Sequence, residues 1–340
     1  MSRDILKKID GESILSIGLD VCKSKIDICL LGSDQETTFQ ITNSKKEILK
    51  FIALLEESGC RAEVPLIIES TWDYDTLACI LFSQANLNIK EINPIITKNY
   101  VKHTIRWTKT DKTDAKALAN IGIVNKEWLF TYNKSKRFIE ISKKISLISW
   151  LEKQIQSLKR ALQSFSEVFT NLELVESPSV KTMKFTVSEL EKNIKMLQLE
   201  IEEDSLGKED DQKVECIYSI AGVSRYMAQV FYISFAHKDF DSKKSMYAFV
   251  GYDPRLRDSG TFTGKARISK RGNAYVRKKL FQSAFLATKH CKLFKDIYDR
   301  MKEKGKHHYV CVISVVKKMI HIIFSLLKKN SVFDPNFTSS

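Results

Sequence analysis

A long apolar repeat in the middle of the 340-residue chain constrains its fold more than any other feature. Apolar residues advance by threes and fours through two runs, which are Ile141, Ile145, Ile148, Leu151, Ile155, Leu158, Leu162, Phe165 and Phe169, and then Val187, Leu190, Ile194, Leu197 and Ile201. Such heptad seams predict long paired helices, and Pro178 between the runs predicts a connecting loop. We therefore expect a helical coiled-coil insert over residues 135–206. An ordinary pair of packed helices is the alternative, whereas a coiled coil would set the geometry of a dimer.

The segment before this repeat, residues 11–128, has the pattern of an α/β domain. Two apolar runs around a short polar turn are a hairpin signal, and Ser44 with Glu47 forms a capping-box pattern ahead of a helical spacing. The predicted strands cover residues 14–21, 26–31, 37–41, 64–69 and 89–92, and the predicted helices cover 45–55, 73–84 and the residues up to about 125. The order βββαβαβα predicts a mixed sheet with helices on its faces.

Four acidic residues stand where such a sheet can form a metal site. Asp20 ends the first strand and Glu69 ends the buried fourth strand. Asp111 and Asp114 lie three residues apart at the start of a helix, so they share one face. Carboxylates from strand ends and a helix start suit two hard cations such as Mg²⁺, which can clamp both oxygens of a phosphoryl transfer. Each acid alone is also explained as a turn, cap or solvated residue, but their joint placement resembles that of ribonuclease H/RuvC-like nucleases.

Positive charge is concentrated in the C-terminal segment, residues 213–328. The whole chain has a formal net charge of +14, and the stretch Lys243–Lys279 alone holds eleven basic residues against two acids. A focused surplus of this kind favours nucleic acid over a membrane surface as the partner. The residues expected to bind phosphates are Arg255, Arg257, Lys265, Arg267, Lys270, Arg271, Asn273 and Arg277.

Three short motifs in this segment allow a functional and a structural interpretation. Ser259, between Asp258 and Gly260, is a candidate nucleophile on a scissile phosphate, or a polar turn residue, and no local histidine is placed to activate it. Residues 217–224 resemble a helix-hairpin-helix, or an ordinary connection between helices. Residues 206–211 have the composition of a charged hinge.

Several classes of protein are disfavoured. The seven cysteines form no Cys-x-x-Cys pair and no zinc-ligand spacing, so we expect reduced thiols and a cytoplasmic protein. Residues 1–12 are polar and do not form a signal peptide. The longest apolar stretch, residues 309–327, contains Lys317, Lys318 and His321, so we predict a buried or amphipathic helix and no membrane span.

Taken together, these motifs identify the chain as similar to the insertion-sequence 110-type transposases, a DEDD/RuvC-like family that includes the Piv-type DNA invertases. In family order, SIGLDVCKSKIDICLL, LIIESTWDY and TKTDKTDAKALA carry the four acids, and SIAGVS, FVGYDP, RDSG and ISKRGNAYVRKKL follow in the C-terminal segment. The resemblance covers about residues 14–290, and every acid and the RDSG serine are present.

The resemblance implies a fold of class α/β plus α: a RuvC/ribonuclease H-like N-terminal domain, a helical coiled-coil insert and a mainly helical C-terminal transposase domain. It implies that Asp20, Glu69, Asp111 and Asp114 bind Mg²⁺ as two ions. It also implies that Ser259 attacks DNA to form a phosphoserine link, and that homodimers or tetramers act on element ends and target DNA with a structured guide RNA. The location would be the cytoplasm of a prokaryote, at the nucleoid.

Two other functions remain open from the sequence. A RuvC-like structure-specific endonuclease would hydrolyse DNA with water and would not need Ser259. A non-catalytic nucleic-acid-binding coiled-coil protein would use the four acids only structurally, and its binding would weaken steeply with salt.

Overall fold

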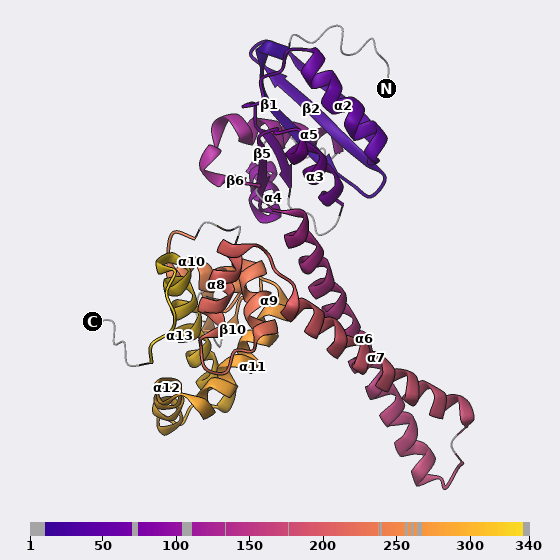
Figure 1. Cartoon of the computed structure of the whole chain (residues 1–340), viewed down its shortest axis with the longest axis vertical. Helices are drawn as coiled ribbons and strands as arrows, with labels where there is room; N and C mark the ends of the chain where they lie inside the picture. Colours follow the sequence, from indigo (N-terminus) through magenta and orange to yellow (C-terminus); the bar gives the residue numbers. More distant parts are fainter. Residues whose placement is uncertain are drawn as a thin grey trace. The chain divides into compact units, whose positions relative to one another are not determined.

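The computed structural model describes residues 11–69, 74–103, 111–132, 134–175, 177–236, 238, 240–255, 258–259, 262–263 and 267–335. The chain divides into two compact units, Met1–Lys134 and Ser135–Ser340. The first is an α/β unit and the second consists mostly of helices (Figure 1).

The first unit is built on a six-stranded mixed sheet with the strand order β3-β2-β1-β4-β5-β6. Its strands are β1 (Ile14–Val21), β2 (Lys25–Gly32), β3 (Glu36–Thr42), β4 (Leu66–Glu69), β5 (Ile89–Ile92) and β6 (Phe130–Thr131). The strands β1, β2 and β3 form an antiparallel meander, whereas β1, β4 and β5 run parallel. The predicted mixed sheet is therefore confirmed, and its parallel strands carry their C-terminal ends to one edge.

Helices of the first unit cover both faces of this sheet. They are α2 (Lys45–Glu57), α3 (Thr76–Gln84), α4 (Pro94–His103) and α5 (Asp111–Val124), and short 3₁₀ turns cover Gly11–Ser13 and Lys126–Trp128. The Ser44 side chain caps α2 by accepting from the Glu47 backbone N–H at 3.4 Å, as its sequence pattern predicts. Phe51 of α2 packs edge-to-face on Phe39 of β3 at 5.9 Å between ring centroids. This aromatic contact fixes α2 to one face and leaves the other face to α5.

The second unit begins with a long helical hairpin. It consists of α6 (Lys136–Asn171) and α7 (Pro178–Glu203), with Pro178 at the first helical turn. Members of both predicted seams are buried between the two helices and the helical body, namely Ile141, Ile145, Ile148, Ile155, Val187, Ile194 and Ile201. The predicted pair of long helices and the loop between them are therefore confirmed, whereas the coiled coil stays a prediction. Its outer end projects from the helical body (Figure 1).

The body of the second unit packs around α13 (His308–Lys329). The other helices are α8 (Lys208–Tyr218), α9 (Arg225–Phe235), α10 (Lys243–Val250), α11 (Ala274–His290) and α12 (Lys292–Glu303). By length and composition α13 resembles a membrane span, but eight of its side chains are buried and it packs on α10, α11 and α12. This packing is that of the buried helix predicted from the sequence.

The structure corrects the predicted hinge at residues 206–211. Lys208 begins α8, and its first turn carries Glu209, Asp210 and Asp211. Acidic side chains stabilise the N-terminal turn of a helix through its dipole, so this charge run forms a helix start. The Asp211 carboxylate also accepts a hydrogen bond from the Leu206 backbone N–H at 2.9 Å.

A charged cluster fastens α6 to α11. The Glu152 carboxylate accepts hydrogen bonds from the ammonium groups of Lys278 and Lys279, each at 2.9 Å, and from the Tyr275 hydroxyl at 3.2 Å. The Tyr275 hydroxyl also lies 2.7 Å from that of Tyr226. Burial raises the pKa of Glu152, but the two lysines outweigh this effect and hold the pKa below its ordinary value. Lys278 and Lys279 of the basic stretch are therefore used in contacts within the protein.

Replacement of this carboxylate, Glu152→Gln, is expected to lower the free energy of unfolding at pH 7 by about 1–3 kcal/mol, since two lysines lose a charged acceptor. Because folding lowers the pKa of Glu152, its contribution is present at neutral pH and lost as the pH falls below about 4. The difference between wild type and variant should therefore shrink in acid. Urea unfolding followed by circular dichroism at several pH values measures both effects.

The matched control is Glu191→Gln, which removes a carboxylate 2.7 Å from Lys159 in an ion pair whose side chains are 44% and 51% exposed. A change of less than about 0.5 kcal/mol is expected there. Equal losses in the two variants would contradict a special role for the Glu152 cluster.

Candidate active site

The register of the sheet brings Asp20 and Glu69 to neighbouring strand ends. The parallel strands β1 and β4 pair Gly18 with Ile67 and Leu19 with Ile68. One step further along the same register, Asp20 stands beside Glu69, each at or next to the C-terminal end of its strand. Both residues are partly accessible.

The two carboxylates also share a face of the sheet. A Cβ atom on Gly18 would lie 2.0 Å from the Ala115 carbonyl oxygen, so Gly18 faces α5. A Cβ atom on Gly122 of α5 would lie 2.8 Å from the Ile67 side chain, so Ile67 faces α5 as well. Side chains alternate along a strand, and therefore Asp20 and Glu69, two residues further on, point to this same face.

The direction of α5 carries its acidic start toward these strand ends. Gly122 lies against Ser16 near the beginning of β1, and Ala119 and Ala115 lie against Gly18 further along it. Continuing in this direction, Asp114 and then Asp111 approach the end of β1 where Asp20 stands. The structure describes Asp111 as the first residue of α5 but not its side chain.

A fifth carboxylate, which the sequence analysis did not identify, lies on the same face. Asp27 of β2 is the direct cross-strand partner of Asp20. Its side chain is buried, accepts a hydrogen bond from the Gln40 amide at 2.9 Å, and lies 3.2 Å from the Lys25 ammonium. The alternation of Ile26, Asp27 and Ile28 is the signal that could have found it, since it turns Asp27 away from the apolar face.

The chemistry of this edge fits a hard divalent cation. Its donors are carboxylate oxygens, which Mg²⁺ prefers, and they come from rigid strands and a helix start. Among the side chains that the structure describes, no three histidine, cysteine or acidic residues form a metal-holding group, and Asp111 lies outside that set. The fold therefore brings the strand ends that carry Asp20 and Glu69, and the start of α5, to one edge of the sheet.

The basic loop that carries Ser259 is closed firmly at its base. Gly251 ends α10 in the left-handed conformation at φ 83°, and a Cβ atom there would lie 2.6 Å from the Arg271 backbone nitrogen. A Cβ atom on Gly272 would lie 2.1 Å from the Phe249 carbonyl oxygen. The Asp253 backbone carbonyl accepts a hydrogen bond from the Ser269 backbone N–H at 2.8 Å, and the Asp253 carboxylate accepts one from the Ser269 hydroxyl. Two glycines thus permit the backbone approach that closes the loop.

Two short strand pairs lie beyond this base. Strand β7 (Pro254–Arg255) pairs with β10 (Arg267–Ile268), and β8 (Asp258–Ser259) pairs with β9 (Phe262–Thr263). Ser259 is thereby the last residue of β8, opposite Phe262. Arg255 and Arg267 are both exposed and lie directly opposite each other. Because their positive charges repel, this arrangement is unfavourable unless an anion lies between them. The predicted phosphate ligands Arg257 and Lys265 lie outside the described residues.

Two other predicted phosphate ligands have partners inside the protein. The Arg277 guanidinium donates to the Val250 carbonyl at 3.0 Å and to the Gly272 carbonyl at 2.5 Å. Burial lowers the pKa of Arg277. The Asn273 side chain caps α11 by accepting from the Tyr275 backbone N–H at 2.8 Å. Both residues therefore shape the loop, whereas Lys270 and Arg271 are exposed.

The turn between α8 and α9 is packed against α11. Gly222 has φ 84°, and a Cβ atom there would lie 2.5 Å from the Ala287 backbone nitrogen. The glycine of the helix-hairpin-helix-like motif is thus explained by packing within the unit.

Comparison with known proteins places these two units in one class. Residues 17–167 match a family described as "Transposase", and residues 214–299 match the "Transposase IS116/IS110/IS902 family". The pilin gene-inverting proteins of Moraxella bovis and Moraxella lacunata are each 22% identical over 326 residues, 94% of this chain and 97% of theirs. The 42 kDa protein of insertion element IS900 of Mycobacterium paratuberculosis is 23% identical over 101 residues, 30% of this chain and 25% of that protein. Among solved structures, T. thermophilus RuvC in complex with Holliday junction substrate is similar at a TM-score of 0.26 and 8% identity, covering 34% of this chain and 99% of that one.

The two family matches together span more than half of the chain and both describe transposases, so the chain is a DNA transposase or recombinase. Within that class it belongs to the insertion-sequence 110-type transposase family.

The contact that orients α5 can be tested with Gly18→Ala. The added methyl group overlaps the α5 backbone, so the first unit should lose about 1–3 kcal/mol of stability. Hydrogen exchange in increasing urea should show earlier opening of the β1 and α5 amides. The control Gly32→Ala places its Cβ atom 3.0 Å from the Ser13 carbonyl oxygen, and a smaller loss is expected. Wild-type protection in Gly18→Ala would contradict this packing.

Proposed function

We propose that this transposase cleaves and rejoins DNA by Mg²⁺-dependent phosphoryl transfer with Ser259 as the nucleophile, guided by a structured RNA. The observation that carries the proposal is the convergence of Asp20, Glu69 and the acidic start of α5 on one face and edge of the sheet. This edge supports assignment of the first unit to the RuvC/ribonuclease H-like class.

The carboxylates of Asp20, Glu69, Asp111 and Asp114 would hold two Mg²⁺ ions. Such ions supply positive charge to the attacking and leaving oxygens of a phosphoryl transfer. The protein's own contribution is to hold the acids on two adjacent parallel strands and one helix, so that little reorganisation accompanies the reaction. Asp27 is placed to position Asp20, its direct neighbour across β1 and β2.

Ser259 would form the covalent link to DNA. Its hydroxyl oxygen bonds to the scissile phosphorus while the bond from phosphorus to the deoxyribose oxygen breaks. The serine proton passes to a carboxylate supplied from outside the loop, and the departing deoxyribose oxygen takes a proton from water and leaves as a hydroxyl. A DNA hydroxyl then reverses the exchange and restores the serine, so no oxidant or nucleotide cofactor is needed. Arg255 and Arg267, which lie opposite each other across β7 and β10, would bind phosphate oxygens of a strand held at Ser259.

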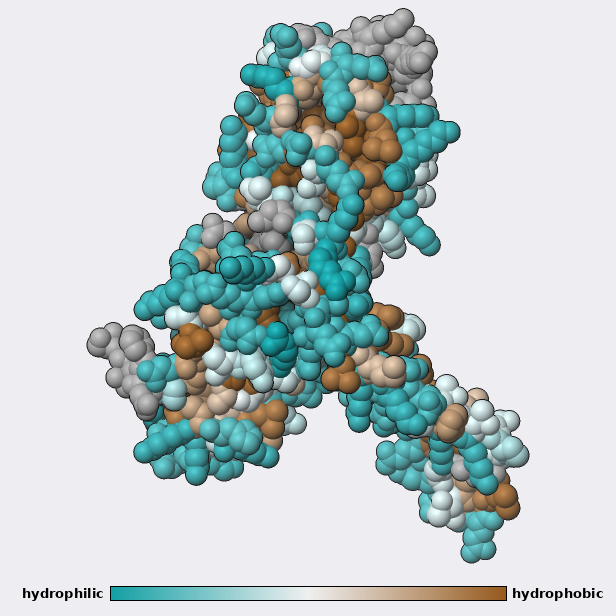
Figure 2. Space-filling view, in the orientation of Figure 1, coloured by the Kyte–Doolittle hydropathy of each residue, from teal (hydrophilic) through white to brown (hydrophobic). Residues whose placement is uncertain are grey.

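The helical hairpin is proposed to form a coiled coil with further copies, giving a homodimer or tetramer. Its outer end exposes several large apolar side chains, namely Val168, Leu172, Leu174, Met183 and Phe185. Figure 2 shows hydrophobic residues at this end of the hairpin. A second helical hairpin would bury them. The partners would be element ends, target DNA and the guide RNA, in the cytoplasm at the nucleoid of a prokaryote.

The serine role is tested by searching for a covalent protein–DNA adduct. Wild type and Ser259→Ala are incubated with Mg²⁺, DNA containing the element ends and RNA from its non-coding flank, then resolved under denaturing conditions. The proposal expects an adduct that mass spectrometry maps to Ser259 and that the variant lacks. Strand cleavage of equal extent in both proteins, without an adduct, would overturn the serine role and indicate a RuvC-like endonuclease.

The carboxylate role is tested with Asp20→Asn and Glu69→Gln. Each should reduce strand cleavage at least about 100-fold, since transition-state charge is no longer stabilised, while DNA affinity changes little. Gel assays of cleavage and of binding, run on the same preparations, separate the two effects. Products formed at the wild-type rate would contradict the proposal and favour a structural role for the acids.

A further inference from the structure

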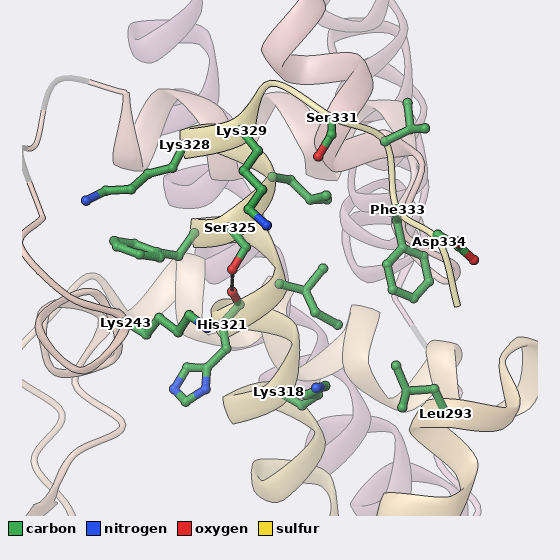
Figure 3. Close-up of a pocket in the computed structure, with 14 residues that line it drawn as sticks. Lys243, Leu293, Lys318, His321, Ser325, Lys328, Lys329, Ser331, Phe333 and Asp334 are labelled. Atoms are coloured by element: carbon green, nitrogen blue, oxygen red, sulfur yellow. Dashed lines mark hydrogen bonds between the residues drawn. The ribbon is translucent and has the colours of Figure 1, made fainter. Parts of the chain in front are cut away.

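A basic hollow in the second unit lies outside both parts of the proposed active site. It has a volume of about 710 Å³ and is lined by the start of α10, the C-terminal half of α13 and the residues that follow α13 (Figure 3). Four lysines and one acid line it, namely Lys243, Lys318, Lys328, Lys329 and Asp334. None of these lysines belongs to the predicted phosphate-binding set or to the Glu152 cluster.

The positive charge of this hollow is incompletely neutralised. In the described part of the chain, Lys243, Lys318 and Lys328 form no ion pair, although the Lys328 ammonium lies 4.9 Å from the centre of the Phe324 ring. Burial lowers the pKa of His321, and the nearby charges of Lys317, Lys243 and Lys318 lower it further. A concentrated positive field of this kind attracts anions.

His321 also offers a buried polar atom to a ligand. Its Nε2 is buried without a hydrogen-bond partner among the described residues. The imidazole and the Lys243 side chain lie together in Figure 3, from α13 and α10 respectively. A buried nitrogen without a partner is unfavourable, and an oxygen of a bound anion would satisfy it.

The wall of the hollow is fixed by specific contacts. The Phe333 backbone N–H donates to the Ser219 hydroxyl at 2.8 Å, and the Phe333 ring stacks on Phe294 at 5.9 Å between centroids. These contacts fasten the segment after α13 to the helical body, so the apolar side of the hollow is built into the unit.

A second hollow continues the basic lining across α8 and α9. It shares Phe324 and Lys328 with the first hollow and adds Lys238 and Lys213, the latter in an ion pair with Glu209 at 2.8 Å. We call the two hollows together the lysine groove. Several lysines, spread over three helices and the segment after α9 around a half-buried aromatic ring, match a chain of phosphates better than one small anion.

The groove is also close in sequence and space to the Ser259 loop. Lys243 is the first residue of α10, and the loop leaves the other end of this eight-residue helix. A helix of this length spans about 12 Å, which is roughly the rise of three or four base pairs. One nucleic acid can therefore reach both places.

We propose that the lysine groove binds the phosphodiester backbone of a nucleic acid, as an anchoring site separate from the Ser259 loop. This inference rests on the proposed function, because it assigns part of the same DNA–RNA complex. DNA and RNA share the recognised chemistry, and the experiment distinguishes them.

The test compares wild type with the triple variant Lys243→Gln/Lys318→Gln/Lys328→Gln. Fluorescence anisotropy measures binding of a labelled 30-nucleotide RNA, a DNA strand of the same sequence and the corresponding duplex, at several salt concentrations. For the probe that occupies the groove, the variant should bind at least about 10-fold more weakly. The slope of the logarithm of the binding constant against the logarithm of the salt concentration should fall in magnitude by about 2–3. Loss with RNA alone assigns the groove to RNA, loss with DNA alone assigns it to DNA, and either supports the proposal.

The matched control, Lys292→Gln/Lys295→Gln/Lys302→Gln, removes the same charge from exposed positions on α12. Equal weakening of binding in both triple variants, or unchanged binding in the groove variant, would overturn the proposed binding site.

Thermal unfolding checks that the variants are folded. As an independent readout, the NMR signals of the His321 ring should shift when the probe is added to wild type. If wild type forms the Ser259 adduct but the groove variant binds normally, only this inference fails. Absence of binding by wild type to every probe would contradict the proposed function as well.

Discussion

The close contact between Gly18 and α5 is the interaction on which the candidate active site depends. Because Gly18 has no side chain, the backbone of α5 crosses β1 at Ala115 and Ala119. This crossing directs the start of α5, with Asp111 and Asp114, toward the strand ends where Asp20 and Glu69 stand. The sheet contributes the remaining constraint, since parallel pairing of β1 with β4 places both acids at one edge and on one face.

Part of the positive charge of the second unit is used in internal contacts. Lys278, Lys279 and Arg277 bond to Glu152 or to backbone carbonyls and thereby fix α11 and the base of the Ser259 loop. By contrast, Lys243 of α10 and Lys318 and Lys328 of α13 form no ion pair among the described residues, and they line a hollow. Net charge alone therefore overstates the surface available to phosphates, and the position of each acidic partner decides which basic groups remain accessible.

Local signals in the sequence predicted most of the fold. The apolar runs of β1 and β2 around a polar turn, the Ser44 cap and the apolar periodicity of α6 act over a few residues, so they are visible without tertiary information. The ion pair of the buried Lys279 was not predictable from local signals, because its partner Glu152 is 127 residues away along the chain. Asp27 was missed although the alternation of Ile26, Asp27 and Ile28 is visible locally, and its place beside Asp20 depends on the register of the β1–β2 hairpin. The acids after Leu206 were assigned to a hinge although they equally suit a helix start.

The central claim is that the edge formed by β1, β4 and the start of α5 is a metal site. Its most direct test is Mn²⁺ binding measured by electron paramagnetic resonance in wild type, Glu69→Gln and the control Asp34→Asn, which changes an exposed acid on the turn after β2. The account predicts Mn²⁺ bound by wild type and the control, displaced by excess Mg²⁺, and at least about 10-fold weaker in Glu69→Gln. Equal Mn²⁺ affinity in all three proteins would contradict it.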